Sequence, residues 1–196
     1  MKMLFFGAGV VGSFYAAKLH AAGHDVTILA RGTRYEQVRE HGIVLEDFST
    51  GERSTAPVQV VDEMPTDEPF DVCVVAVQKT QLESALTALG TNPHIRSYLS
   101  LVNAAEDSGD LINAVGRDRV VLGHANVGGE RDDHVTLYMT AQEMTIGELS
   151  GEKTERLQRI ASIFRDAGLP CFSARTWNHG RNSTWPLSSP SVVRCT

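Results

Sequence analysis

A glycine-rich turn near the amino terminus constrains the fold of this chain more than any other feature. The stretch FFGAGVVGSF places Gly7, Gly9 and Gly12 directly after an apolar run and at the start of a helical pattern. In such a motif the first glycine permits a tight turn, the second lets a pyrophosphate approach the backbone, and the third allows close helix–strand packing. Glycine-rich turns also serve packing alone, but a strand before and a helix after favour dinucleotide binding at the helix N-terminus. We therefore expect cofactor contacts from the whole turn: Gly7, Ala8, Gly9, Val10, Val11 and Gly12.

Short apolar runs alternate with helical patterns through the first 125 residues, which is typical of βαβ units around a mostly parallel sheet. Strands are expected at Lys2–Phe6, Asp25–Ala30, Val58–Val61, Asp71–Val77, Tyr98–Val102 and Arg119–Leu122. Helices are expected at Val11–Ala21, Thr33–His41, Gln81–Leu89 and Ser108–Val115. The pattern predicts the α/β class, with a Rossmann-type, doubly wound sheet.

The remaining segments extend this sheet. Ile43–Thr55 has turn residues in its middle and predicts an inserted hairpin. From His134 on, the stretches VTLYMT and EMTIGEL predict two adjacent strands at the far, antiparallel edge of the sheet. A helix is then expected at Glu152–Ala167 and a last short strand at Leu169–Phe172.

Composition excludes several classes of partner. A formal charge of −6 disfavours a nucleic-acid or anionic-membrane surface, which would need clustered Lys and Arg. No apolar run approaches the roughly 20 residues that span a bilayer. The three cysteines are odd in number and widely spaced, so they indicate neither a disulfide framework nor a zinc or other metal site. A reducing, cytoplasmic setting is expected.

The residue that closes the second strand indicates which dinucleotide is bound. NAD-binding proteins usually carry an acid there, about 20 residues after the glycine turn, to hold the ribose 2′-hydroxyl. Here the stretch reads ILARG, with Arg31 at that place and Arg34 a turn later, while Asp25 lies at the opposite end of the strand. A guanidinium suits a 2′-phosphate through bidentate hydrogen bonds, which favours NADP. The alternative is that Arg31 is a solvated surface residue.

With FFGAGVVG, LARG, DVCVVAVQKTQ, LVNAAED and the pair HVTLYMT/EMTIGE in this order, the chain resembles the ketopantoate reductase (2-dehydropantoate 2-reductase) family over about residues 2–175. The resemblance implies a Rossmann-type N-terminal domain, an all-helical C-terminal domain and an active site in the cleft between them. It also implies NADPH-dependent reduction of ketopantoate to pantoate, on the route to pantothenate, or of a related 2-oxo acid.

The resemblance assigns roles to individual residues. Gly7, Gly9 and Gly12 correspond to the phosphate-binding turn, and Arg31 corresponds to the 2′-phosphate arginine. Asn103 corresponds to an asparagine that contacts cofactor and substrate; its alternative role is that of a simple turn residue. The family usually has a glycine next, where this chain has Ala104. Gly129 falls where a small residue brings its backbone near the cofactor.

A second family motif, Lys-x-x-Gln, is altered in this chain. Aligned through Gln81, the lysine position holds Gln78, and Lys79 stands one place later. Because side chains alternate along a strand, this shift would turn Lys79 away from the site unless the chain has already left the sheet. Gln78 can still hydrogen-bond a ribose or an amide of the cofactor. The catalytic groups therefore remain unknown, with Lys79 and Asn103 as the candidates.

The end of the chain departs from the family. The proton donor of the family is a lysine just inside the helical domain, shortly after a tryptophan; here Trp177 is present, but no lysine follows Lys153. From Ala167 to Thr196 the chain contains no Asp, Glu or Lys. We therefore expect an NADP-binding domain at residues 1–175 and a tail, or an altered remnant of the second domain, at residues 176–196, with the helical domain missing. His179 is a further candidate for the proton donor.

Three functions follow from these features. The first is an oxidoreductase that reduces a small-molecule 2-oxo acid with NADPH, impaired by truncation. The second is an NADP-binding module without turnover. The third, a SAM-dependent methyltransferase, usually has an acid at the end of the second strand, so the ILARG stretch counts against it. An uncovered face where a helical domain would dock would favour homo-oligomer formation.

Overall fold

The computed structural model describes residues 1–102, 108–140 and 143–174. Among these residues the strands are β1 (Lys2–Phe6), β2 (Asp25–Leu29), β3 (Ile43–Asp47), β4 (Arg53–Ala56), β5 (Gln59–Val61), β6 (Phe70–Val75), β7 (Ile95–Ser100), β8 (Val120–His124), β9 (Val127–Asp132), β10 (Val135–Thr140), β11 (Met144–Glu148) and β12 (Cys171–Ser173). The helices are α1 (Val10–Ala21), α2 (Thr33–His41), α3 (Lys79–Leu89), α4 (Ser108–Val115), α5 (Glu155–Asp166) and the short 3-10 helix η2 (Arg117–Arg119). The predicted tail at residues 176–196 and the candidate Asn103 lie outside the described residues.

Eight of these strands form a central sheet in the order β12-β11-β8-β7-β6-β1-β2-β5. Neighbours from β5 to β8 pair in parallel, whereas β11 is antiparallel to β8 and parallel to β12. This arrangement confirms the predicted mostly parallel sheet with an antiparallel pairing toward one edge. The other four strands form a second sheet in the order β4-β3-β10-β9.

The central strands are mostly apolar because helices cover both faces of the sheet. In β1, Met3 and Phe5 pack on the side of α1 and α5, and Leu4 and Phe6 pack on the side of α3 and α4. All four side chains are buried. Such continuous apolar runs are expected of parallel strands that are covered on both sides.

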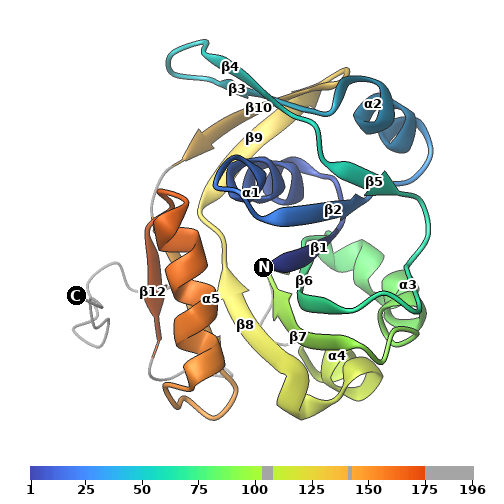
Figure 1. The fold of residues 1–196 in the computed structure, drawn as a ribbon, viewed down its shortest axis with the longest axis vertical. Coiled ribbons are helices and arrows are strands. Elements are labelled where there is room, and N and C mark those ends of the chain that lie inside the picture. Colours follow the sequence, from blue (N-terminus) through green and yellow to red (C-terminus); the bar gives the residue numbers. More distant parts are fainter. Residues whose placement is uncertain (103–107, 141–142, 175–196) are drawn as a thin grey trace.

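Helix α1 lies between the central sheet and the second sheet (Figure 1). Its residues are therefore buried nearly all round, including Ser13 and Phe14. The Phe14 ring lies 4.8 Å from the Tyr138 ring of β10, measured between centroids. The second sheet thus packs directly on the helix that follows the glycine turn.

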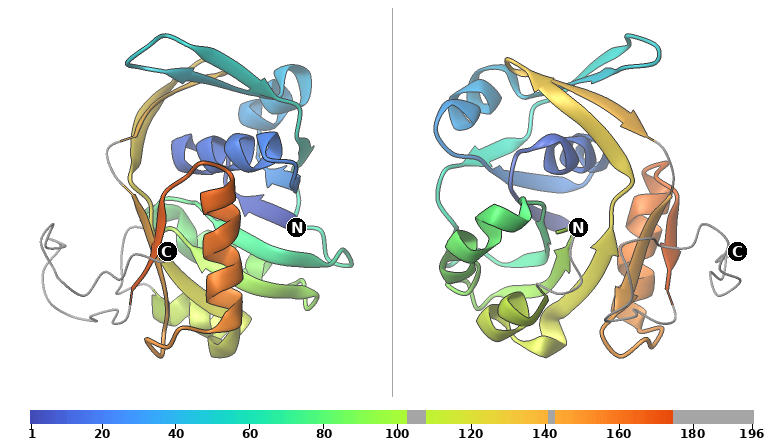
Figure 2. Two further views of the ribbon diagram at one scale, coloured as in Figure 1. Left: turned by 60° about the vertical axis from the view of Figure 1, so that its left-hand side comes forward. Right: turned by 180° about the vertical axis from the view of Figure 1, so that it is seen from behind.

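The predicted pairing of the two strands after His134 is wrong. Strand β10 pairs with β9 and β3 in the second sheet, whereas β11 pairs with β8 and β12 in the central sheet. The reason is that β8 and β9 form one long, bent run that crosses from the central sheet to the second (Figure 2), with only Ala125 and Asn126 between them. Strand β10 turns back on β9 and so stays in the second sheet. The predicted hairpin at Ile43–Thr55 is confirmed, as antiparallel β3 and β4.

An ion pair between Glu148, whose side chain is buried, and Arg156 joins β11 of the central sheet to α5. Glu148, at the end of β11, accepts hydrogen bonds from Arg156 Nε at 2.8 Å and from Thr154 Oγ1 at 2.5 Å. Thr154 also caps α5 by accepting from the Leu157 N–H at 3.2 Å. Burial alone would raise the pKa of Glu148, but the hydrogen bonds from Arg156 and Thr154 outweigh it and lower this pKa below its ordinary value.

Replacing Glu148 with glutamine should destabilise the fold by about 2 kcal/mol at neutral pH, since charged hydrogen bonds are lost at a buried site. The pKa of Glu148 is lower in the folded chain than in the unfolded chain, where it is about 4.3. Its contribution is therefore complete above about pH 4.3 and is lost as pH falls through the folded-state pKa. Urea unfolding between pH 3 and 7, roughly the range over which this carboxyl titrates, should show a smaller acid loss in the variant. The exposed Glu155→Gln change on α5 is the matched control, and an equal effect of both would contradict the assignment.

Candidate functional site

The glycine turn joins β1 to α1, and two of its glycines are required by the backbone. Gly7 has φ +116°, and a Cβ there would lie 2.8 Å from the Ala76 carbonyl oxygen. A Cβ on Gly12 would lie 1.9 Å from the Gly7 carbonyl oxygen. These two positions hold the turn, the helix and the β6–α3 connection in close contact, as the motif predicts.

Gly9 differs from both, because nothing in the described structure requires a glycine there. It is the N-cap of α1 with φ −75°, which any residue adopts, and a Cβ would meet no atom within 4 Å. The first turn of α1 contains no acidic residue, and Gly9 provides no side-chain cap. The open space therefore lies in front of helix N–H groups that lack a side-chain acceptor, which fits the phosphates of a dinucleotide.

A cavity of about 370 Å³ lies beyond the carboxyl end of β2. Arg31, which follows β2, lines it together with residues of α2 and of the β9–β10 hairpin. The full lining is Arg31, Thr33, Arg34, Gln37, Arg131 and Asp133. The cavity is thus rich in guanidinium groups, and the contact of Arg31 with a 2′-phosphate stays a prediction.

Arg34 has a different role from the one its position beside Arg31 suggested. Only 7% of it is exposed, and its guanidinium is bound by protein acceptors. Nε donates to the Ala8 carbonyl at 3.1 Å, and Nη1 donates to the His134 carbonyl at 3.0 Å. Nη2 donates to the hydroxyls of Ser13 and Thr136 at 3.0 and 3.1 Å. Arg34 therefore connects the glycine turn to β10.

Gln78 and Lys79 lie where the chain has already left the sheet. Strand β6 ends at Val75, Gln78 is the N-cap of α3, and Lys79 is its first residue. The Gln78 N–H donates to Gln81 Oε1 at 3.2 Å. The alternation of side chains along a strand therefore does not apply to Lys79. Its one-residue shift from the family position does not by itself turn it away from the site. The connection also abuts the glycine turn, since a Cβ on Gly7 would lie 3.0 Å from Val77 Cγ1.

The structure places Gly129 in β9, opposite Tyr138 of β10. A Cβ there would lie 2.0 Å from the Leu137 carbonyl oxygen, so strand packing already requires this glycine. Its proposed approach to the cofactor stays a prediction. Sequence reasoning missed Arg131, three positions after Gly128, because the stretch VGGERD carries no strand pattern that would direct a side chain to Arg31.

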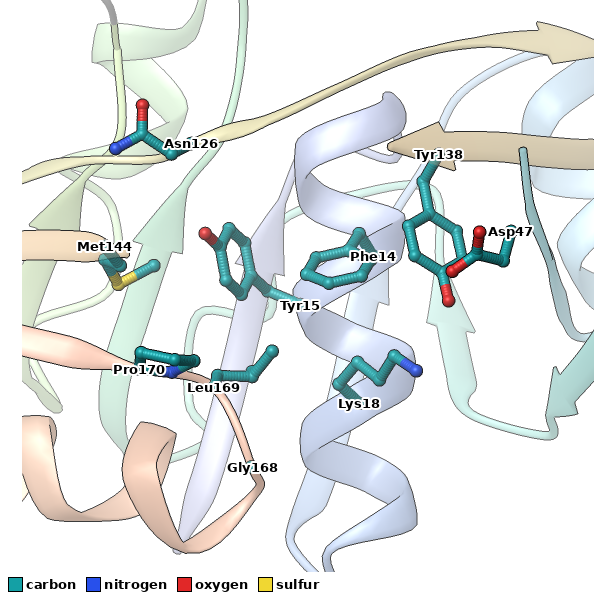
Figure 3. Close-up of a pocket in the computed structure, with 10 residues that line it drawn as sticks. All are labelled: Phe14, Tyr15, Lys18, Asp47, Asn126, Tyr138, Met144, Gly168, Leu169 and Pro170. Carbon is teal, nitrogen blue, oxygen red and sulfur yellow. The ribbon is translucent and has the colours of Figure 1, made fainter. Parts of the chain in front are cut away.

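A second cavity, also about 370 Å³, flanks α1 (Figure 3). Phe14, Tyr15 and Lys18 project from α1, with Tyr138 and Asp47 on one side and Met144, Leu169 and Pro170 on the other. Lys18 Nζ lies over the Phe14 and Tyr138 rings at 5.8 and 5.5 Å from their centroids. No residue of the glycine turn lines this cavity, and neither does Arg31.

The described residues contain neither a membrane-spanning helix nor a cluster of metal ligands. No helix in residues 1–102, 108–140 and 143–174 is long and apolar enough to cross a membrane. The same part of the chain has no group of three or more His, Cys, Asp or Glu side chains arranged to hold a metal ion.

Comparison with known proteins gives a uniform result. Residues 3–151 match the family described as "Ketopantoate reductase PanE/ApbA". The 2-dehydropantoate 2-reductase of Mesorhizobium japonicum is 29% identical over 195 residues, which cover 86% of this chain and 58% of that protein. The chain thus spans a little over half the length of this curated relative.

Solved structures share the fold. The 2-dehydropantoate 2-reductase from Geobacter metallireducens GS-15 superposes with a TM-score of 0.79 at 22% identity, covering 89% of this chain and 58% of that one. A D-mandelate dehydrogenase in a ternary structure with NADH and anilino(oxo)acetate gives 0.76 at 19% identity, covering 89% and 57%. Because the family match spans most of the chain and includes the glycine turn, this chain belongs to the ketopantoate reductase PanE/ApbA family.

Proposed function

We propose that this chain binds NADPH and forms the cofactor half of a reductase that converts a 2-oxo acid, ketopantoate or a related compound, into the 2-hydroxy acid. The overall reaction consumes one NADPH and one proton, and it gives NADP⁺ and the alcohol. The open space at Gly9 supports this proposal most directly, because neither backbone conformation nor packing explains that glycine.

Each part of the site has a distinct task in this proposal. The first turn of α1 holds the pyrophosphate through its N–H groups. Arg31 binds the 2′-phosphate of the adenosine ribose, and Gln78, at the start of α3, hydrogen-bonds the cofactor beside the glycine turn. When bound, the reduced nicotinamide supplies the hydride. Lys79 and Asn103 stay candidates for contacts to the substrate.

Replacing Arg31 with alanine should weaken NADPH binding by about 30-fold, because charge-assisted hydrogen bonds to the 2′-phosphate are lost. NADH binding should change by less than about 2-fold, since NADH has no group there. Nicotinamide fluorescence titration of the purified chain measures both. Arg159→Ala, an equal charge change on the exposed side of α5, is the control, and equal losses for the two cofactors would contradict NADP specificity.

The second candidate is an NADP-binding module without turnover. It is favoured by Gln78, which stands where the family motif has a lysine and supplies no charge. Mixing the chain with NADPH and ketopantoate while following the nicotinamide absorbance separates the two. Oxidation at an enzymatic rate would exclude the module, and NADPH binding without oxidation would exclude independent catalysis on ketopantoate.

A further inference from the structure

Arg131, in β9 of the second sheet, reaches the same cavity as Arg31. Both residues line the cavity of about 370 Å³, although 100 positions separate them in the chain. Arg31 comes from the end of a central strand, and Arg131 comes from the strand that crosses into the second sheet (Figure 2). The cavity is therefore built by both sheets.

The strand register fixes the side of the second sheet to which Arg131 belongs. Arg131 pairs directly with Thr136 of β10, and opposed residues in an antiparallel pair have side chains on the same face. Thr136 is fully buried, and its Oγ1 accepts from Arg34 Nη2 at 3.1 Å. Arg131 therefore lies on the face of the second sheet against which Arg34 packs. Burial, and then the charge of Arg131, lower the pKa of Arg34 to about 10, which agrees with this proximity.

The charges around the cavity are unbalanced. Within the described residues, neither Arg31 nor Arg131 forms an ion pair with a carboxylate. Asp133 is the acidic residue that lines the cavity. Its carboxylate is hydrogen-bonded to Gln37 Nε2 at 2.9 Å and to His134 Nδ1 at 2.9 Å. Three arginines thus line one cavity, and two of them, Arg31 and Arg131, are exposed, in a chain whose net charge is −6. Because like charges close together repel one another, this arrangement favours the binding of an anion in the cavity.

We propose that Arg131 is a second specificity-determining residue, which binds the 2′-phosphate of NADPH from the side opposite Arg31. This inference rests on the proposed function. A phosphate monoester carries nearly two negative charges at neutral pH and three acceptor oxygens, so it can accept hydrogen bonds from two guanidinium groups at once. The second sheet is then part of the cofactor site.

Fluorescence titration of Arg131→Ala, Arg31→Ala and the double variant with NADPH and NADH tests the inference. Arg131→Ala should weaken NADPH about 10-fold and NADH less than about 2-fold, and Arg131→Lys should recover part of the loss because the charge remains. Arg159→Ala again controls for net charge. Since Arg131 is exposed, its variants should fold as the parent does, which circular dichroism can verify.

The outcomes separate the inference from the function on which it rests. If the parent chain prefers NADPH and Arg31→Ala removes that preference, while Arg131→Ala matches Arg159→Ala, the inference is overturned and the proposed function stands. If the parent chain shows no preference for NADPH, both fail. A selective NADPH loss in Arg131→Ala, with a weaker salt dependence than the parent, supports both.

Discussion

Replacement of Arg34 with lysine is expected to destabilise the fold by about 3 kcal/mol, although the charge is retained. The guanidinium donates to two carbonyls and two hydroxyls on three different segments of the chain. An ammonium group is a point donor on a different stem and cannot reach all four acceptors. Those left without a partner at a buried site each cost about 1–3 kcal/mol. Urea unfolding followed by circular dichroism measures the difference.

The matched control is Arg39→Lys, on the exposed face of the same helix, where the arginine pairs with Glu36. That change should alter stability by less than about 0.5 kcal/mol. Arg34→Lys should also weaken NADPH and NADH equally, because Nε no longer holds the Ala8 carbonyl and the glycine turn loosens. A loss confined to NADPH would show instead that Arg34 acts on the 2′-phosphate.

Local sequence signals were sufficient to predict the first strand and the first two helices. Strand β1 and helix α2 have the predicted bounds, and α1 begins one residue earlier than predicted. Continuous apolar residues define β1 because both faces of the sheet are covered. Glycines flank α2 on either side, at Gly32 and Gly42. The close packing of the glycine turn was predictable for the same reason, because its residues are neighbours in sequence.

The β3–β4 hairpin was predictable, but the assembly of the second sheet was not, because contacts between distant segments join this hairpin to β10. Strand β9 contains two glycines and three charged residues, so propensity and alternation both fail there. Its pairing with β10, and that of β10 with β3, decide which arginines share a cavity. The burial of Arg34 follows from the same pairing, since two of its four acceptors belong to the β10 segment. Arg131 and the true role of Arg34 could therefore be recognised only in the folded chain.

Replacement of Gly9 with alanine should weaken both NADPH and NADH by about 100-fold while leaving the stability of the fold unchanged. The added methyl group meets no protein atom within 4 Å, and the backbone at φ −75° accommodates alanine without strain. It does occupy the space through which the pyrophosphate must approach the first turn of α1. Crowding of this kind costs about 1–3 kcal/mol, and each 1.4 kcal/mol is tenfold in affinity. Fluorescence titration and urea unfolding of the same sample measure the two quantities.

Gly12→Ala is the informative comparison, because it is the same chemical change three residues later. Its methyl group would lie 1.9 Å from the Gly7 carbonyl oxygen, so the helix and the turn must move apart. This variant should lose about 2 kcal/mol of stability as well as cofactor affinity, despite the better helix propensity of alanine. A Gly9 variant that is also destabilised would show that the open space there is needed for folding. A Gly9 variant that is stable and binds as tightly as the parent would mean that the pyrophosphate does not lie at this turn, and the cofactor site would have to be placed elsewhere.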